Sequence, residues 1–206
     1  GATDSFAIGN STQVTGAYSI ALGQEAKVDK DFSSAVGYQA HANGSSSVAI
    51  GVWAKTFGSA SAALGHSAEA SGFESLALGN HAKTDSRADQ ALAVGVNASA
   101  VGKASNAIGS NAQAYGESGI AIGSNALTTL VRTIAIGDGA QATAQSEDVA
   151  LGANSKTSNV ISTPNTVIDG KTYNYAGINP TSTLSVGKSG AERTITNVAA
   201  GRVSAT

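Results

Sequence analysis

The sequence predicts an all-β protein, a parallel β-solenoid of about eleven coils. Three observations predict this fold: one short pattern recurs at a fixed period, 25 of the 206 residues are glycine, and only 5% of residues are aromatic. A chain with so few large side chains must pack through small residues and close backbone approach. There is no cysteine, so no disulfide or thiolate site contributes to the structure.

The repeat is Ala, an aliphatic residue and Gly, and it returns every fourteen residues. Fourteen residues suit two strands of about five residues and two tight turns, so strands of successive coils stack in parallel about 4.8 Å apart. The predicted rod is on the order of 50 Å long. The repeat glycines are Gly9, Gly23, Gly37, Gly51, Gly65, Gly79, Gly95, Gly109, Gly123, Gly137 and Gly152.

The turns are marked by insertions and by a second glycine. Two intervals are longer than fourteen residues, which places insertions near residues 86–90 and 145–148, where we expect turns. The second glycine lies seven residues after the first and is predicted to take a positive φ at a turn. It occurs as Gly16, Gly44, Gly58, Gly72, Gly102 and Gly116.

The strand that follows each repeat glycine alternates small and polar residues, as in Ala26-Lys27-Val28. This alternation predicts one dry face and one wet face. Residues in the outward column are candidates for ligand contact, with two aromatic residues from the neighbouring column; the alternative is a solvated face that keeps the rod soluble. The candidate contact residues are Lys27, His41, Lys55, Lys83, Phe57 and Tyr115.

The strand before each repeat glycine alternates bulky aliphatic residues with Ala and Ser, and Asp148 is the one charge on it. Both faces therefore look buried, yet a single chain can cover only one of them. We expect the neutral Ala/Ser face to be a subunit interface, because a long neutral sheet left open would aggregate. Simple exposure of these small residues remains the alternative. The interface prediction names Ser19, Ala21, Ser47, Ala49, Ser75, Ala77, Ala107 and Ala121.

Composition and spacing argue against several function classes. The net charge of −2 gives no case for binding nucleic acid or anionic lipid, and no apolar run is long enough for a membrane helix. We expect no catalytic residues, small-molecule substrate, metal or cofactor. His41, His66 and His81 occupy different coil positions, so no two are predicted to form a column of metal ligands. An ice-binding solenoid would need a regular Thr column, whereas Thr56, Thr84 and Thr128 are predicted to face inward.

Residues 159–184 break the repeat and contain Pro164 and Pro180. Asp169-Gly170 lies between short β-prone runs and predicts a hairpin turn. We expect this insert to cap the open end of the solenoid or to pack on a neighbouring chain.

The run from Ser105 to Ala114 resembles the head repeat of trimeric autotransporter adhesins of Gram-negative bacteria, the YadA-like group. Tyr175-Ala176-Gly177, Pro180 and Ser185-Val186-Gly187 resemble the head-insert motif, and residues 185–201 resemble the neck that joins head to stalk. The resemblance implies a left-handed parallel β-roll, a homotrimer, and a stalk and outer-membrane anchor missing from this sequence. It divides the chain into head repeats (1–158), head insert (159–184) and neck (185–206).

The resemblance also implies a role at the bacterial cell surface. It suggests binding to host cells or to the extracellular-matrix proteins collagen, fibronectin or laminin, and autoagglutination; the alternative is a spacer that projects another binding domain. Glu192 and Arg193 are hypothesised to pair between chains. The predicted neck residues are Gly187, Gly190, Glu192, Arg193, Asn197 and Gly201.

Overall fold

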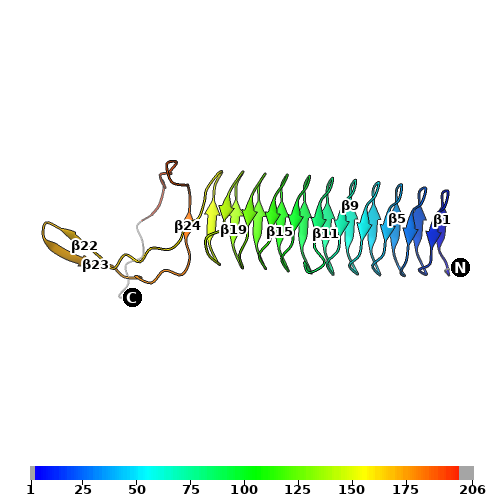
Figure 1. The fold of residues 1–206 in the computed structure, drawn as a ribbon, viewed down its shortest axis with the longest axis horizontal. Helices are drawn as coiled ribbons and strands as arrows, with labels where there is room; N and C mark the ends of the chain where they lie inside the picture. Colours follow the sequence, from blue (N-terminus) through cyan, green and yellow to red (C-terminus); the bar gives the residue numbers. More distant parts are fainter. Residues whose placement is uncertain (1–2, 200–206) are drawn as a thin grey trace.

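The computed structural model describes residues 3–199, in which successive coils stack into a rod (Figure 1). Two parallel sheets run along it, sheet A of twelve strands and sheet B of ten, and the chain alternates between them. This confirms the parallel β-solenoid. Sheet A contains β1 (Phe6–Ile8), β3 (Ile20–Leu22), β5 (Ser34–Val36), β7 (Val48–Ile50), β9 (Ala62–Leu64), β11 (Leu76–Leu78), β13 (Leu92–Val94), β15 (Asn106–Ile108), β17 (Ile120–Ile122), β19 (Ile134–Ile136), β21 (Val149–Leu151) and β24 (Leu184–Ser185). Sheet B contains β2 (Gln13–Val14), β4 (Lys27–Val28), β6 (His41–Ala42), β8 (Lys55–Thr56), β10 (Glu69–Ala70), β12 (Lys83–Thr84), β14 (Ser99–Ala100), β16 (Gln113–Ala114), β18 (Leu127–Thr128) and β20 (Gln141–Ala142).

The strands are shorter than the five residues predicted, because turns occupy more of each coil. In each coil the repeat glycine adopts a positive φ, as in Gly37 (φ 132°), and so do two turn residues in the left-handed helical region that are seldom glycine; Phe32 (φ 58°) and Trp53 (φ 59°) are examples of the latter. The amide N–H of each donates to the preceding coil, from Phe32 to the Ala17 carbonyl (3.0 Å) and from Trp53 to the Tyr38 carbonyl (2.9 Å). Backbone hydrogen bonds from the residues with left-handed φ therefore connect consecutive coils at both turns. Both predicted insertions lie at turns, as expected.

The second glycine of the repeat has a different role from the predicted one. Gly58 and its counterparts do not have a positive φ, so that prediction is wrong. A Cβ atom on Gly58 would overlap the backbone carbonyl of Gly72 in the next coil. The glycine is needed for close stacking of coils rather than for backbone conformation.

The core between the two sheets contains only small side chains. Val28 and Thr56 are among the largest fully buried residues. The two strands of a fourteen-residue coil lie so close that methyl and hydroxymethyl groups fill the space between them. The inward-facing threonines Thr56, Thr84 and Thr128 are buried as predicted, and so are the small residues of sheet B.

The Ala/Ser face of sheet A lines this core, so its predicted role as a subunit interface is wrong. Its members are at most 2% exposed within one chain, which leaves them no surface for a partner. Their small size is the reason they are inside: bulkier side chains do not fit the coil. The corrected residues are Ser19, Ala21, Ser47, Ala49, Ser75, Ala77, Ala107 and Ala121.

The bulky aliphatic residues of sheet A point away from the core instead. Ile20 is 46% exposed, Ile50 42% and Leu151 46%. These side chains, here called the aliphatic face, lie on the outer side of sheet A, where no other part of the same chain packs against them. It comprises Ile20, Leu22, Val48, Ile50, Leu64, Leu76, Leu78, Leu92, Val94, Ile108, Ile120, Ile122, Ile134, Ile136, Val149 and Leu151.

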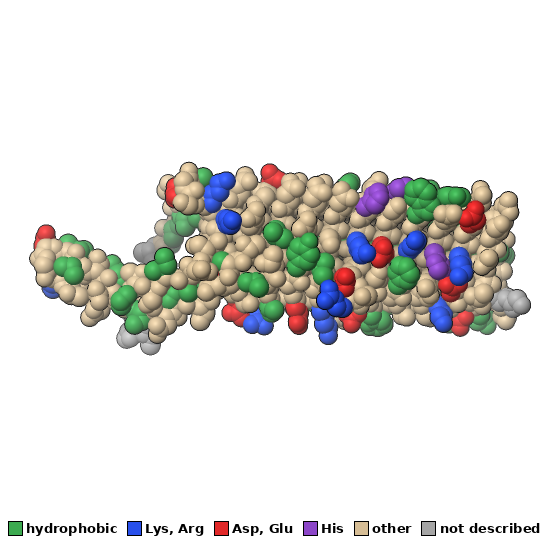
Figure 2. All heavy atoms as spheres, in the orientation of Figure 1, with side chains coloured by type: hydrophobic (Ala, Val, Ile, Leu, Met, Phe, Trp, Pro, Cys, Tyr) green, Lys and Arg blue, Asp and Glu red, His purple; other side chains and the backbone are tan. Residues whose placement is uncertain are grey.

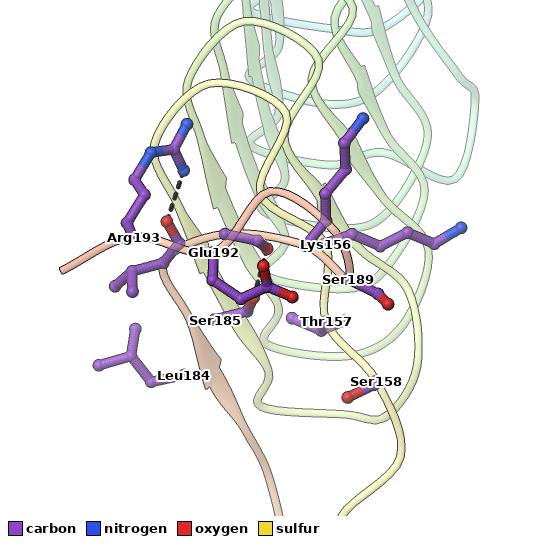
Figure 3. A pocket seen from close by; sticks show the side chains of 11 residues that line it. Lys156, Thr157, Ser158, Leu184, Ser185, Ser189, Glu192 and Arg193 are labelled. Atoms are coloured by element: carbon purple, nitrogen blue, oxygen red, sulfur yellow. Dashed lines mark hydrogen bonds between the residues drawn. The ribbon is translucent and has the colours of Figure 1, made fainter.

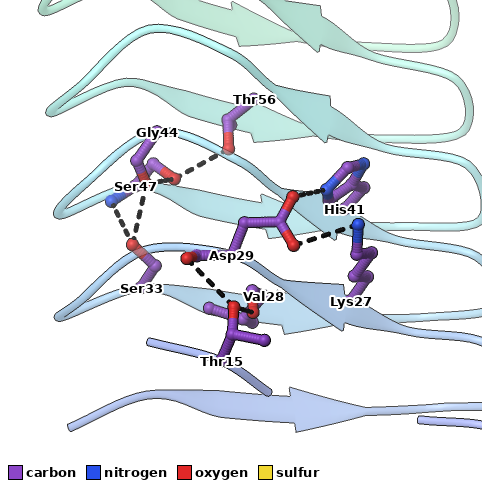
Figure 4. Close-up of polar contacts among 9 residues, drawn as sticks. All are labelled: Thr15, Lys27, Val28, Asp29, Ser33, His41, Gly44, Ser47 and Thr56. Atoms are coloured by element: carbon purple, nitrogen blue, oxygen red, sulfur yellow. Dashed lines mark hydrogen bonds and ion pairs between the residues drawn. The ribbon is translucent and has the colours of Figure 1, made fainter. Parts of the chain in front are cut away.

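Buried hydroxyl groups tie the core to the turns. The Ser33 N–H donates to Ser19 Oγ (3.1 Å), and Ser33 Oγ donates to the Gly44 carbonyl (2.9 Å). Ser47 Oγ lies 2.8 Å from Thr56 Oγ1 on the opposite sheet (Figure 4). Most polar groups in this narrow interior therefore have partners, as burial requires.

The insert forms the predicted hairpin. Strands β22 (Asn165–Ile168) and β23 (Lys171–Asn174) pair antiparallel, and Asp169 (φ 48°) and Gly170 (φ 74°) make the turn. Two positive φ values match the turn type that Asp-Gly favours. The hairpin projects beyond the rod rather than lying across its end (Figure 1), so it does not cap the solenoid within one chain. Packing on a neighbouring chain stays a prediction.

The chain returns to the rod after the hairpin, where β24 pairs with β21. The buried Asp148 fixes this return. Its carboxylate accepts from the Thr183 N–H (2.8 Å), from Thr183 Oγ1 (3.0 Å) and from the Gln145 N–H (2.9 Å). The Asp148 carboxylate thus connects the turn that contains Gln145 with the segment at Thr183 that leads into β24.

Asp148→Ala is expected to release that segment. The change leaves buried donors at Thr183 and Gln145 without an acceptor, which costs about 2 kcal/mol. We expect trypsin to cleave the variant at Lys188 and Arg193 several-fold faster, with the coils before Asp148 left intact. Asp138→Ala, an exposed carboxylate of the same coil, is the matched control. Equal cleavage rates in the two variants would contradict this role.

Residues of the predicted neck line an open pocket of about 500 Å³ at the end of the rod (Figure 3). Arg193 donates to Ser155 Oγ (2.8 Å) and to the carbonyls of Val186 and Ala153. Glu192 accepts from the Gly190 N–H (2.8 Å), and its pairing with Arg193 of another chain stays a prediction. Lys188 and Ala191 form a short antiparallel bridge; Gly187 precedes Lys188, and Gly190 lies in the turn between the two bridged residues. Asn197 is exposed, and Gly201 lies outside the described residues.

Candidate binding surface and family

The outer face of sheet B carries the predicted contact column. Lys27, His41, Lys55, Glu69 and Lys83 are adjacent in register on successive strands. Figure 2 shows positive and negative side chains intermixed on the half of the rod nearer the N-terminus. The column is therefore a mixed-charge strip rather than a row of free cations.

Asp29 organises the first part of this strip (Figure 4). Its Oδ2 lies 2.6 Å from His41 Nε2 and its Oδ1 lies 3.1 Å from Lys27 Nζ. Burial acts to raise the pKa of the Asp29 carboxyl, but hydrogen bonds and charge from His41 and Lys27 outweigh it, so the pKa is lowered from its ordinary value of 3.8. Sequence reasoning missed Asp29 because it lies in the neighbouring column, two residues beyond Lys27.

The lowered pKa predicts a pH dependence of stability. A carboxyl whose pKa is lower in the folded state stabilises the fold above its unfolded pKa, and this contribution is lost as the pH falls from about 4 through the folded pKa. Asp29→Asn should reduce the free energy of unfolding at pH 7 by less than about 1 kcal/mol, because the contacts of Asp29 with Lys27 and His41 are only partly buried. Denaturant titrations should show this difference shrinking at pH 2.5. A difference that stays constant with pH would contradict the assignment.

The other cations of the strip differ in their partners. Lys83 pairs with Glu69 (3.0 Å), whereas Lys55 has no ion-pair partner among residues 3–199. Phe57 follows β8 and is 46% exposed, so Lys55 and Phe57 form the most available part of the predicted surface. Tyr115 is also exposed, but four coils separate it from Phe57, roughly 19 Å along the rod. The structure does not bring these two aromatic residues together.

An aromatic ladder at one turn was missed by sequence reasoning. Tyr38, Trp53, His66 and His81 come from four successive coils, with ring centroids 6.2, 5.1 and 5.5 Å apart in that order. They alternate between the first and second residue after the repeat glycine, and the turn brings these two positions together. His66 and His81 do occupy different coil positions, as the sequence indicates, but the spacing did not predict that their rings lie next to each other. A second stack, Tyr18 on Phe32 (5.4 Å), was detectable because those residues are fourteen apart.

The repeat and its solenoid match a known family model. The YadA head domain repeat matches residues 1–26, 29–52, 42–68, 58–82, 70–98, 100–126 and 131–155. The chain belongs to the YadA head repeat family. The match covers most of the YadA-type coils described above, in agreement with the predicted resemblance.

Individual relatives cover different parts of the chain. Autotransporter adhesin BtaE of Brucella suis biovar 1 (strain 1330) is 62% identical over 52 residues, which are 25% of this chain and 7% of that protein. The collagen-binding domain of the Yersinia adhesin YadA aligns over 98% of this chain and 79% of its own, with 24% identity and a TM-score of 0.47. The C-terminal YadA-like domain of a Burkholderia pseudomallei protein aligns over 42% of this chain and 36% of its own, with 40% identity and a TM-score of 0.29. In residues 3–199 no helix is long and apolar enough to span a membrane.

Proposed function

We propose that this chain is the head of a homotrimeric adhesin on the bacterial cell surface, held in the outer membrane by an anchor beyond this segment. The observation that carries the proposal is the aliphatic face, which follows sheet A along the rod and has no cover within one chain. Membership of the YadA head repeat family and the similarity to an autotransporter adhesin support the same role.

The aliphatic face gives the assembly a physical basis. Large contiguous apolar surfaces in water mark interaction sites. Burying a Leu or Ile side chain completely contributes about 1.5–3 kcal/mol, and side chains near 40% exposure have a substantial part of that still to gain. Because the face repeats in every coil, copies of the same chain in register bury it along the whole rod. A heterologous partner would need the same repeat spacing.

The adhesin binds through the surface that remains outside. Sheet B and the turns present similar groups on many coils and, in a trimer, in three copies, so weak contacts add through avidity. Lys55 and Phe57 are the proposed contact residues, because Lys55 has no ion-pair partner among the described residues and Phe57 is well exposed. Collagen, fibronectin and laminin are the ligands that the resemblance to YadA-like adhesins suggests, together with self-association between bacteria.

A spacer function is the second candidate, favoured by the ion pairs of sheet B. Lys27, His41 and Lys83 each lie beside a carboxylate of their own chain, which leaves less charge for a ligand. A spacer would hold a separate binding domain away from the cell.

Solid-phase binding of the purified chain to collagen, fibronectin and laminin separates these functions. The adhesin proposal predicts saturable binding to at least one of them, weakened several-fold by Lys55→Glu and Phe57→Ala. Gln141→Ala, at the far end of the same sheet, is the control expected to bind normally. Absence of binding to all three proteins, with binding by a longer form of the protein, would favour the spacer.

A further inference from the structure

His66 and His81 lie side by side on the surface of the rod. His66 follows β9 and His81 follows β11, so they belong to successive coils, and both are exposed. Their ring centroids are 5.5 Å apart and their planes are tilted by 59°. Figure 2 shows histidine side chains next to large hydrophobic ones at the upper edge of the rod. Two imidazoles from different coils thus share one small area of surface.

A second observation concerns the protonation of His81. Its Nδ1 is hydrogen-bonded to the side-chain oxygen of the adjacent Asn80. With Nδ1 as the donor to the amide oxygen, which only accepts hydrogen bonds, the lone pair lies on Nε2 and is available to a metal. Histidines that bind metals commonly donate their other ring N–H to an oxygen acceptor, which fixes the tautomer and orients the ring. Asn80 is a positioning residue of this kind.

The spacing of the rings fits a shared metal ion. A metal about 2.1 Å from one nitrogen of each ring places the two centroids roughly 5 Å apart. The observed 5.5 Å is therefore reached by small side-chain rotations. Trp53 packs edge-on against His66, with centroids 5.1 Å apart, and restricts the motion of that ring. We propose that His66 and His81 form a surface site for a divalent transition metal: Cu²⁺, Ni²⁺ or Zn²⁺.

The ligand set determines the class of metal. Imidazole nitrogens suit copper, nickel and zinc, whereas calcium and magnesium prefer oxygen. In residues 3–199 no group of three or more His, Cys, Asp or Glu residues is arranged to hold a metal, so water completes the coordination. Two imidazoles alone favour Cu²⁺ over Ni²⁺ and Zn²⁺, following the usual order of stability.

Tryptophan fluorescence reports directly on this site. Trp53 is the single tryptophan of the chain and lies in contact with His66. A bound Cu²⁺ ion next to its ring quenches its emission, so titration of the tag-free chain with Cu²⁺ should give saturable quenching with one equivalent per chain. Calorimetry with Zn²⁺, which does not quench, gives an independent measure.

Single substitutions distinguish chelation from binding to one histidine. His66→Ala and His81→Ala should each weaken Cu²⁺ binding at least about tenfold, and Asn80→Ala a few-fold. His41→Ala is the matched control, because His41 lies beside Asp29 on sheet B and should leave the titration unchanged. Circular dichroism confirms that each variant is folded. The proposal is overturned if either ladder variant binds Cu²⁺ as the parent does, or if His41→Ala weakens binding equally.

Discussion

Ile122→Glu is expected to separate the proposed trimer into single chains. Ile122 lies on β17 in the middle of the aliphatic face, with aliphatic neighbours Ile108 and Ile136 in register on the adjacent strands. Burial of an unpaired carboxylate in an apolar interface is strongly unfavourable, and symmetry repeats it in every copy. We expect subunit affinity to fall at least hundredfold, which corresponds to about 3 kcal/mol. Size-exclusion chromatography with light scattering measures the change in mass.

The control for this variant is Gln113→Glu, which adds the same charge to the outer face of sheet B. It should leave the assembly intact, since that face is solvated in either state. Both variants should keep the circular dichroism of the parent, because neither residue lies between the two sheets. An Ile122→Glu protein that assembles normally would place the interface elsewhere.

Gly65→Ala is expected to cause a large loss of stability. Gly65 has φ +134°, a conformation that residues with a side chain rarely adopt, and a Cβ atom there would lie 2.6 Å from the carbonyl oxygen of Gly79. Backbone strain and overpacking each cost about 1–3 kcal/mol, so we expect a loss of about 3 kcal/mol or more. Chemical denaturation at one fixed protein concentration measures the loss.

Ser59→Ala provides the comparison for Gly65→Ala, because it alters an exposed turn residue of the preceding coil without crowding the next one. Its stability should stay within about 0.5 kcal/mol of the parent. A Gly65→Ala protein with the same denaturation midpoint would show that coils can separate locally at little cost, contrary to the close stacking described here.

The repeat was enough to predict the solenoid, the sites of insertion and the Asp169-Gly170 hairpin, because each depends on local spacing or turn chemistry. The orientation of sheet A was not predictable from alternation alone, since a period of two defines two faces without saying which is inside. The range of residue types in each column of sheet A could have shown which face is inside. Phe6 and Asn106 share the outer column with Ile and Leu, whereas Ala recurs in the inner one from Ala21 to Ala150. Only a tightly packed interior demands such uniform size.

The candidate site was partly predictable for a related reason. Coil register correctly placed Lys27, His41 and Lys55 in one column. Register says nothing about contacts between columns, which depend on side-chain rotamers and on the corner geometry of the turn. The Asp29 cluster and the His66–His81 pair both cross columns, and for that reason spacing alone missed them.

The central claim is that the aliphatic face of one chain needs further copies of the same chain to cover it. Light scattering of the purified chain at micromolar concentration tests this most directly. We expect a particle with three times the 20.2 kDa mass of the chain. A folded, soluble particle of 20.2 kDa would contradict it.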